Sequence, residues 1–166
     1  LCTLSIDEMH KSNYSIMKKE EMFMYNALTV ANFVIEYCNR IGRGISNLKL
    51  QKMLYFIQAE FLVFANKPCF SDTIEAWDFG PVVPSVYHRY KVYGSAIIPF
   101  SSEMALHEVI TTEDKNMIIA MIDQVAPYSA SQLVELTHRQ DPWKASYIRG
   151  CNNVITNNSI RKYFEE

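Results

Sequence analysis

Histidine and cysteine are the residue types most able to hold a metal or act as a nucleophile, and this chain of 166 residues spaces them widely. None of the four histidines has a close metal-ligand spacing, such as HExxH, with Cys, Asp or Glu; they are His10, His88, His107 and His138. The cysteines form no CxxC pair and no dense disulfide framework; they are Cys2, Cys38, Cys69 and Cys151. The sequence therefore predicts no metal site, and a reducing cytosol is the simpler setting for the thiols.

Catalytic motifs are equally absent from the sequence. There is no GxSxG, no phosphate-binding P-loop and no GxGxxG dinucleotide motif. Cys38 lies on the apolar stripe of a predicted helix, which indicates a small core residue rather than a nucleophile. Acidic pairs such as Glu113-Asp114 lie at predicted helix ends, where capping and solvation account for them. We expect no catalytic residue, no cofactor and no enzymatic activity, although a triad assembled from distant residues stays an open alternative.

The composition favours a soluble, cytoplasmic, globular protein. Hydrophobic residues make up 49% of the chain and the formal net charge is −2, so there is no general field for a polyanion. Basic residues form two small groups, one within 40–52 and one at Arg89 and Lys91. The first interpretation of these groups is a solvated face, the second is a site for an acidic protein, and the third is a site for nucleic acid. The most apolar stretch, 53–65, is shorter than the roughly 20 residues that span a bilayer, so we expect no membrane partner.

Helical periodicity dominates the chain and predicts a mainly α fold, a single compact domain of six or seven helices. Capping residues, apolar stripes, glycines and prolines place these helices at 29–41, 46–65, 84–93, 112–126 and 129–138, from Asp141 onward, and at 157–164. The helix at 46–65 is apolar on most sides and is expected to be the spine of the fold. Residues 73–79 alternate like a short strand, and 96–99 is its expected partner in a minor two-stranded β element.

The amino-terminal residues differ from the rest of the chain. Residues 1–23 are polar and weakly periodic, and we expect them to be an extension, with a short helix at 15–24, outside a main domain at 24–166. The alternative is an ordinary amino-terminal helix packed on that domain.

Two blocks of sequence carry the most information. The first is LKLQKMLYF at 48–56, continued by EAWDFGPVVPSVY at 75–87, and the second is LVELTHRQDPW at 133–143. These blocks resemble the Panacea antitoxin domain, also described as the SocA-like or GepA-like phage-associated domain. Its motifs are KLQK-LLYF, EAW-x-x-GPV-x-P-x-VY and L-x-x-LTH-x-x-x-PW, and here Met53 replaces one leucine. The resemblance covers roughly 24–164.

The resemblance implies an antitoxin that neutralises a cognate toxin, usually encoded by the adjacent gene, through direct protein–protein binding. It also implies two alternatives: a proteolytic adaptor that delivers the toxin to a Clp protease, and a phage-associated transcriptional regulator. The leading residues are too few for a helix-turn-helix domain, so DNA is not an expected partner. Because one core serves unrelated toxins, we expect the extension or an exposed face to select the toxin.

Nine motif residues are candidates for partner binding or for specifying the fold: Lys52, Tyr55, Trp77, Gly80, Pro81, Tyr87, Arg89, His138 and Trp143. Structural roles are favoured for Trp77 and Trp143, each with one partner for its indole N–H, and for Gly80-Pro81 as a turn between strand and helix. For the other five, both roles stay open. Lys52 and Tyr55 are expected to present polar tips from the long helix, and His138 to bond carbonyls at a helix end.

Overall fold

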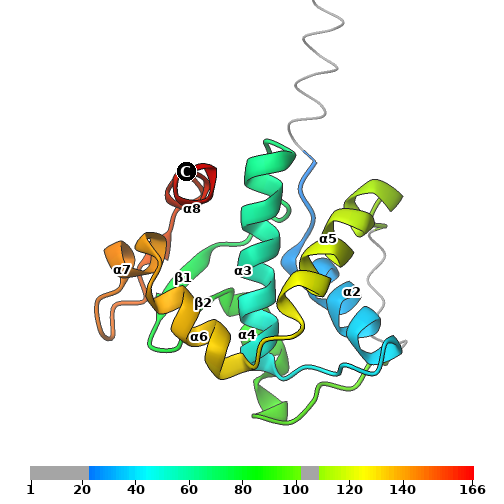
Figure 1. Ribbon diagram of the computed structural model, residues 1–166. Helices are drawn as coiled ribbons and strands as arrows, with labels where there is room; N and C mark the ends of the chain where they lie inside the picture. Colours follow the sequence, from blue (N-terminus) through cyan, green and yellow to red (C-terminus); the bar gives the residue numbers. More distant parts are fainter. Residues whose placement is uncertain (1–22, 102–108) are drawn as a thin grey trace, which may run out of the picture.

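The computed structural model describes residues 23–101 and 109–166, which form a mainly α structure with a small sheet (Figure 1). Its seven α-helices and one short 3-10 helix are, in chain order, α2 (Ala27–Arg40), α3 (Asn47–Phe64), α4 (Pro84–Tyr90), η1 (Lys91–Tyr93), α5 (Thr112–Val125), α6 (Ala130–His138), α7 (Asp141–Ser146) and α8 (Asn157–Glu165). The strands are β1 (Ile74–Trp77), β2 (Gly80–Val82) and β3 (Val154–Ile155). The mainly α fold predicted from periodicity is confirmed.

Helix α3 is the spine of the fold, as its wide apolar surface predicted. It stands in the middle of Figure 1 and contacts α2, α5, α6, α8 and β2. Every residue from 50 to 59 is buried, including Gln51, Lys52 and Gln58. Gln58 accepts the backbone N–H groups of Cys69 and Phe70 at 2.9 and 3.2 Å, so this buried amide ties the segment after α3 to the helix. Buried polar groups require such partners, and α3 uses them to hold the surrounding loops.

Most helix ends follow the local rules that the sequence predicted. Ser129 and Gln132 form the expected capping box of α6. The helix predicted from 112 begins at that residue, and one predicted cap, at Asp141, is wrong by one residue. The N-cap of α5 is Thr111, whose hydroxyl accepts the N–H of Asp114 at 3.2 Å, because a cap must lie three residues before the donor it satisfies. Asp141 is the first residue of α7 rather than its cap, and its carboxylate forms an ion pair with the Lys144 ammonium at 2.8 Å.

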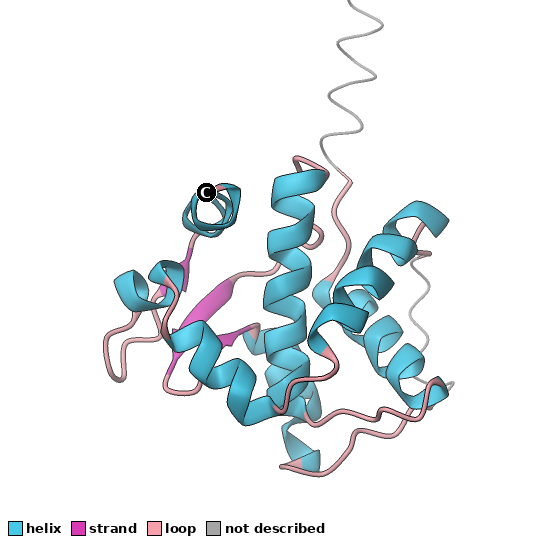
Figure 2. Ribbon diagram, viewed as in Figure 1, coloured by secondary structure: helices cyan, strands magenta, loops and turns pink. Residues whose placement is uncertain are grey.

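The sheet differs from the two-stranded element predicted. It has three antiparallel strands in the order β2-β1-β3, and Figure 2 shows them together on one side of α3. The expected partner at 96–99 is wrong, since β1 pairs instead with 80–82 and with 154–155. Gly80 has a φ of +96°, which lets the chain reverse immediately after β1 and pair with itself. Gly80-Pro81 therefore begins strand β2, and is not the turn between strand and helix.

The first residues that the structure describes already pack into the core. Tyr25 is buried; its N–H donates to the Cys69 carbonyl at 2.9 Å and its hydroxyl to the Asp114 carboxylate at 2.6 Å. Residues 1–22, which include nearly all of the predicted extension and of its helix, lie outside the described residues, so that division of the chain stays a prediction. Across 23–101 and 109–166, no helix is both long and apolar enough to cross a membrane.

Candidate functional site

A buried lysine of α3 binds the β1–β2 hairpin at 74–82. The Lys52 ammonium is fully buried and donates to the Pro81 carbonyl at 2.8 Å. Gly80 lies against the same side chain, since a Cβ there would stand 2.8 Å from Lys52 Cε and 2.7 Å from the Thr137 hydroxyl. Desolvation lowers the pKa of Lys52 to about 7. The expectation that Lys52 presents its tip at the surface is wrong, because the carbonyl of β2 takes that tip in the interior.

Two further polar residues of α3 hold the end of the hairpin. The Gln51 side chain accepts the N–H of Val83 at 2.9 Å and donates to Asn47 at 2.9 Å. Asn47 in turn donates to the Tyr87 carbonyl at 3.1 Å, so α4 is tied to the start of α3. Sequence reasoning missed Asn47 and Gln51. The signal that could have found them is two amides four residues apart on a helix expected to be buried on most sides.

Tyr55 is also interior. Its hydroxyl donates to the Gln140 side chain at 3.0 Å, and burial raises its pKa. The predicted exposed polar tip is wrong here too, because Gln140, between α6 and α7, satisfies the hydroxyl within the protein. Lys52 and Tyr55 thus join α3 to the two other motif blocks and are not available to a partner.

Each of the two motif tryptophans has one hydrogen-bond partner for its indole N–H, as the sequence predicted. Trp143 donates to the Trp77 carbonyl at 3.0 Å, and Trp77 donates to the Glu75 carboxylate at 2.7 Å. Trp143 is stacked between the rings of His138 and Tyr147, with centroid distances of 4.0 and 4.4 Å. These contacts fix the back of β1 against α6 and α7.

His138 is at the carboxyl end of α6, as predicted, but its main contact is the Trp143 ring rather than helix carbonyls. Desolvation lowers its pKa, partly offset by a hydrogen bond with the Asp78 backbone. Its Nε2 atom is buried and has no hydrogen-bond partner in the structure. These features favour a neutral, packed imidazole at neutral pH.

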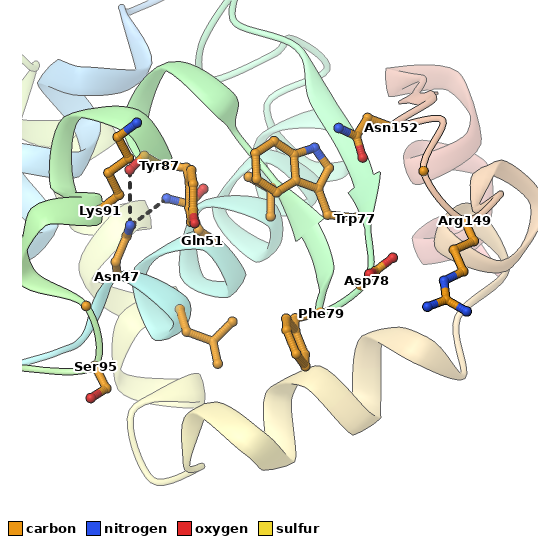
Figure 3. Close-up of a pocket in the computed structure, with 14 residues that line it drawn as sticks. Asn47, Gln51, Trp77, Asp78, Phe79, Tyr87, Lys91, Ser95, Arg149 and Asn152 are labelled. Atoms are coloured by element: carbon orange, nitrogen blue, oxygen red, sulfur yellow. Dashed lines mark hydrogen bonds between the residues drawn. The ribbon is translucent and has the colours of Figure 1, made fainter.

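The front of the hairpin borders a pocket of about 600 Å³ (Figure 3). Trp77 and Val82 of the hairpin and Leu48 of α3 give it an apolar surface. The Trp77 ring meets the Tyr87 ring edge to face at a centroid distance of 4.9 Å. Phe79, at the hairpin turn, also lines the pocket and is 67% exposed. A volume in this range is typical of sites that accept a ligand or a group of partner side chains.

Charged side chains stand at opposite sides of this pocket. In Figure 3, Lys91 of η1 lies beside Tyr87, and Arg149, from the loop after α7, lies on the far side of Trp77. Asp78 is at the same mouth, where its carboxylate accepts the Tyr147 hydroxyl at 2.8 Å.

The structure places the nine predicted residues at different depths around the hairpin. Trp77 and Tyr87 line the pocket, and Arg89 is exposed on α4 outside the lining. Gly80 and Pro81 are buried in the hairpin, while His138 and Trp143 are partly buried behind it. Lys52 and Tyr55, as shown above, are interior. Phe79 and Arg149 were not among the predicted residues, and Lys91 belongs to the basic group at Arg89 and Lys91 that the sequence left open as a site for an acidic protein.

No three His, Cys, Asp or Glu side chains within the described ranges are grouped so that they could hold a metal ion. Cys38 is buried as predicted, and desolvation raises the pKa of its thiol to about 11, which disfavours the reactive thiolate. The arrangement around the hairpin offers apolar contact and charge, which is the chemistry of binding.

Comparison with known proteins decides the family. A family model described as "Antitoxin SocA-like, Panacea domain" matches residues 50–144, more than half of the chain. The chain belongs to this family. It is also similar to the protein named Antitoxin SocA of Caulobacter vibrioides (strain NA1000 / CB15N), with 34% identity over 128 residues, 71% of this chain and 68% of that protein. No solved structure matches the chain.

The resemblance drawn from the motif residues is therefore confirmed, and membership of the SocA-like Panacea family supports an antitoxin role. The matched region 50–144 contains α3 from its fourth residue, the hairpin, α4, α5, α6 and the first residues of α7, so the family motifs build one side of the pocket. Family membership also favours a role that is not enzymatic.

Proposed function

We propose that this protein is an antitoxin that neutralises a cognate toxin by binding it directly through the surface around the hairpin pocket. The observation that carries the proposal is an open pocket of about 600 Å³, bordered by family-motif residues and rimmed by an exposed phenylalanine. Buried motif residues specify the framework, and the exposed rim contacts the toxin.

Exposed aromatic residues in and around pockets are effective anchors for protein partners. Phe79 exposes 67% of its surface at the hairpin turn, and Trp77 lies beside it with its N–H already bonded to Glu75. Aromatic anchors in such positions are enriched among the residues that dominate binding energy. A stable complex buries roughly 1,600 Å² in total, about 800 Å² on each protein, so the interface would extend beyond the pocket. In this mechanism the antitoxin occludes the active surface of the toxin.

The test is co-expression with the product of the adjacent gene. We expect that product to arrest growth when expressed alone, and we expect growth to recover when this protein is co-expressed and co-purifies with it. Rescue without a complex, accompanied by falling toxin levels, would instead support an adaptor for a Clp protease. A neighbour that is harmless when expressed alone would contradict toxin neutralisation at this locus.

A matched pair of variants tests the placement of the interface. Phe79→Ser removes the aromatic rim of the pocket, while Phe64→Ser removes an equally prominent phenylalanine, 74% exposed, near the end of α3. Because both side chains are largely solvent-exposed, neither substitution should disturb folding. We expect Phe79→Ser to weaken toxin binding at least tenfold, which corresponds to about 1.4 kcal/mol, and Phe64→Ser to leave it unchanged. Equal effects of the two variants would place the interface elsewhere.

A further inference from the structure

The charges at the pocket mouth are not balanced within the protein. Lys91 and Arg149 are both exposed, and among the residues that the structure describes neither forms an ion pair. By contrast, Lys144 and Arg139, basic residues of the nearby α6–α7 region, are paired with carboxylates three or four residues away. The two cations that line the pocket therefore keep their charge available to a partner.

The nearby carboxylates are already engaged. Asp78, the acidic residue of the lining, accepts the Tyr147 hydroxyl at 2.8 Å. Glu75, on the preceding strand, accepts the Trp77 indole N–H at 2.7 Å. Within residues 23–101 and 109–166, neither carboxylate forms an ion pair with Lys91 or Arg149. The lining thus has two cations and one anion, an excess of one positive charge, and the anion already accepts a hydrogen bond from Tyr147.

The apolar surface lies between these two cations. In Figure 3, Trp77 stands between Lys91 on one side and Arg149 on the other, and Phe79 lines the same pocket. An apolar side chain of a partner can fill the space above Trp77 and Val82. The residues before and after it in the partner chain then come within reach of the two cations. Such an arrangement is complementary to alternating acidic and apolar residues.

We propose that the pocket binds an acidic segment of the toxin, in which an apolar side chain enters between Lys91 and Arg149 and flanking carboxylates pair with both cations. This proposal rests on the proposed function and specifies the chemistry of its partner. The apolar side chain supplies burial, whereas the carboxylates orient the segment and speed its association. The favoured occupant is a protein segment, because the chain has a formal net charge of −2 and would repel an extended polyanion away from this local site.

Single charge reversals test the proposal with a matched control. Lys91→Glu and Arg149→Glu each change the net charge by two units at the pocket, and Lys162→Glu makes the same change on the exposed face of α8. All three side chains are exposed, and circular dichroism with thermal unfolding verifies that each variant folds. The probe is the purified product of the adjacent gene, titrated against each variant at about 50 mM and about 500 mM salt, where screening differs strongly.

We expect Lys91→Glu and Arg149→Glu each to weaken toxin binding at least tenfold at low salt and to reduce the salt dependence of the affinity. We expect Lys162→Glu to change the affinity less than threefold. Replacing acidic residues of the toxin by lysine, one at a time, should restore affinity for a pocket reversal at one or two positions. If the wild type binds but all three reversals behave alike, or if the pocket reversals strengthen binding, the acidic segment is refuted while direct binding stands. If the wild type does not bind the neighbour at all, the proposed function fails and this proposal fails with it.

Discussion

The buried lysine under the hairpin gives the sharpest test of the structure. Lys52 is fully buried, its ammonium has the Pro81 carbonyl as its partner, and no carboxylate is within ion-pair distance in the described part of the chain. Its pKa falls from 10.5 to about 7 on folding because burial removes the hydration of the charged form. The unfolded protein therefore binds one proton more than the folded protein between these two pH values.

The sign and size of the effect follow from that difference. Below pH 7 both states hold the proton, and the folded state bears the full cost of a desolvated charge. As pH rises toward 10.5 the folded state is neutral while the unfolded state is still charged, so the cost declines and stability increases. The change approaches about 1.4 kcal/mol for each pH unit, which amounts to about 2 kcal/mol between pH 7 and pH 9.

The perturbation is Lys52→Met, which keeps an unbranched side chain, shorter by one heavy atom, and removes its charge. Urea unfolding at pH 7, 8 and 9 should show the free energy of unfolding of the wild type rising relative to the variant by about 2 kcal/mol. The loss of the hydrogen bond to Pro81 costs the variant about 1–3 kcal/mol, but this cost does not depend on pH. Lys162→Met is the control. Because the Lys162 side chain is exposed, the difference in free energy of unfolding between this variant and the wild type should not change with pH. If the free energies of unfolding of the wild type and of Lys52→Met change in parallel between pH 7 and pH 9, a desolvated, easily neutralised lysine at this site is refuted.

Three further predictions concern stability and reactivity. Gly80→Ala should destabilise the protein by at least 2 kcal/mol in urea unfolding, since φ is +96° and the new Cβ would lie 2.7 Å from the Thr137 hydroxyl; a loss below 0.5 kcal/mol would contradict this packing. Ser129→Ala should cost about 1 kcal/mol by removing the capping box of α6, and Ser129→Asp, which keeps an acceptor, should retain most of the stability. In mapping of thiol labelling by mass spectrometry, exposed Cys151 should react readily in the native protein and buried Cys38 only on unfolding, so rapid labelling of Cys38 in the native protein would refute its burial.

The helices of this protein were predictable because their determinants are local. The apolar stripe of α2, the Ser46 cap of α3 and the capping box at Ser129 act over three or four residues, and the structure has all of them. The one predicted cap that differs, at Asp141, is a shift of one residue to Gln140, in a segment where neighbouring polar residues compete for the same role.

The sheet was predicted with the wrong partner because strand pairing is a long-range choice. Residues 96–99 have the apolar content of a strand, but the reversal at Gly80 brings 80–82 into register with β1 across only two intervening residues. Closing so short a loop costs less conformational entropy than bringing 96–99 back to β1. Strand β3 comes from residues 154–155, nearly eighty positions further along the chain, and no local pattern links it to β1.

The helices and, through the motif residues, the family could be predicted from the amino-acid sequence alone. Which polar motif residues are interior and which are exposed depends on contacts between distant parts of the fold. Lys52 and Tyr55 have the residue types of binding groups, yet carbonyl and amide partners far away in sequence, at Pro81 and Gln140, hold them inside. The pocket between Lys91 and Arg149 likewise exists only because segments almost sixty residues apart meet there. Helical periodicity and capping are set by near neighbours, whereas burial and pocket formation depend on contacts that the chain makes only when it is folded.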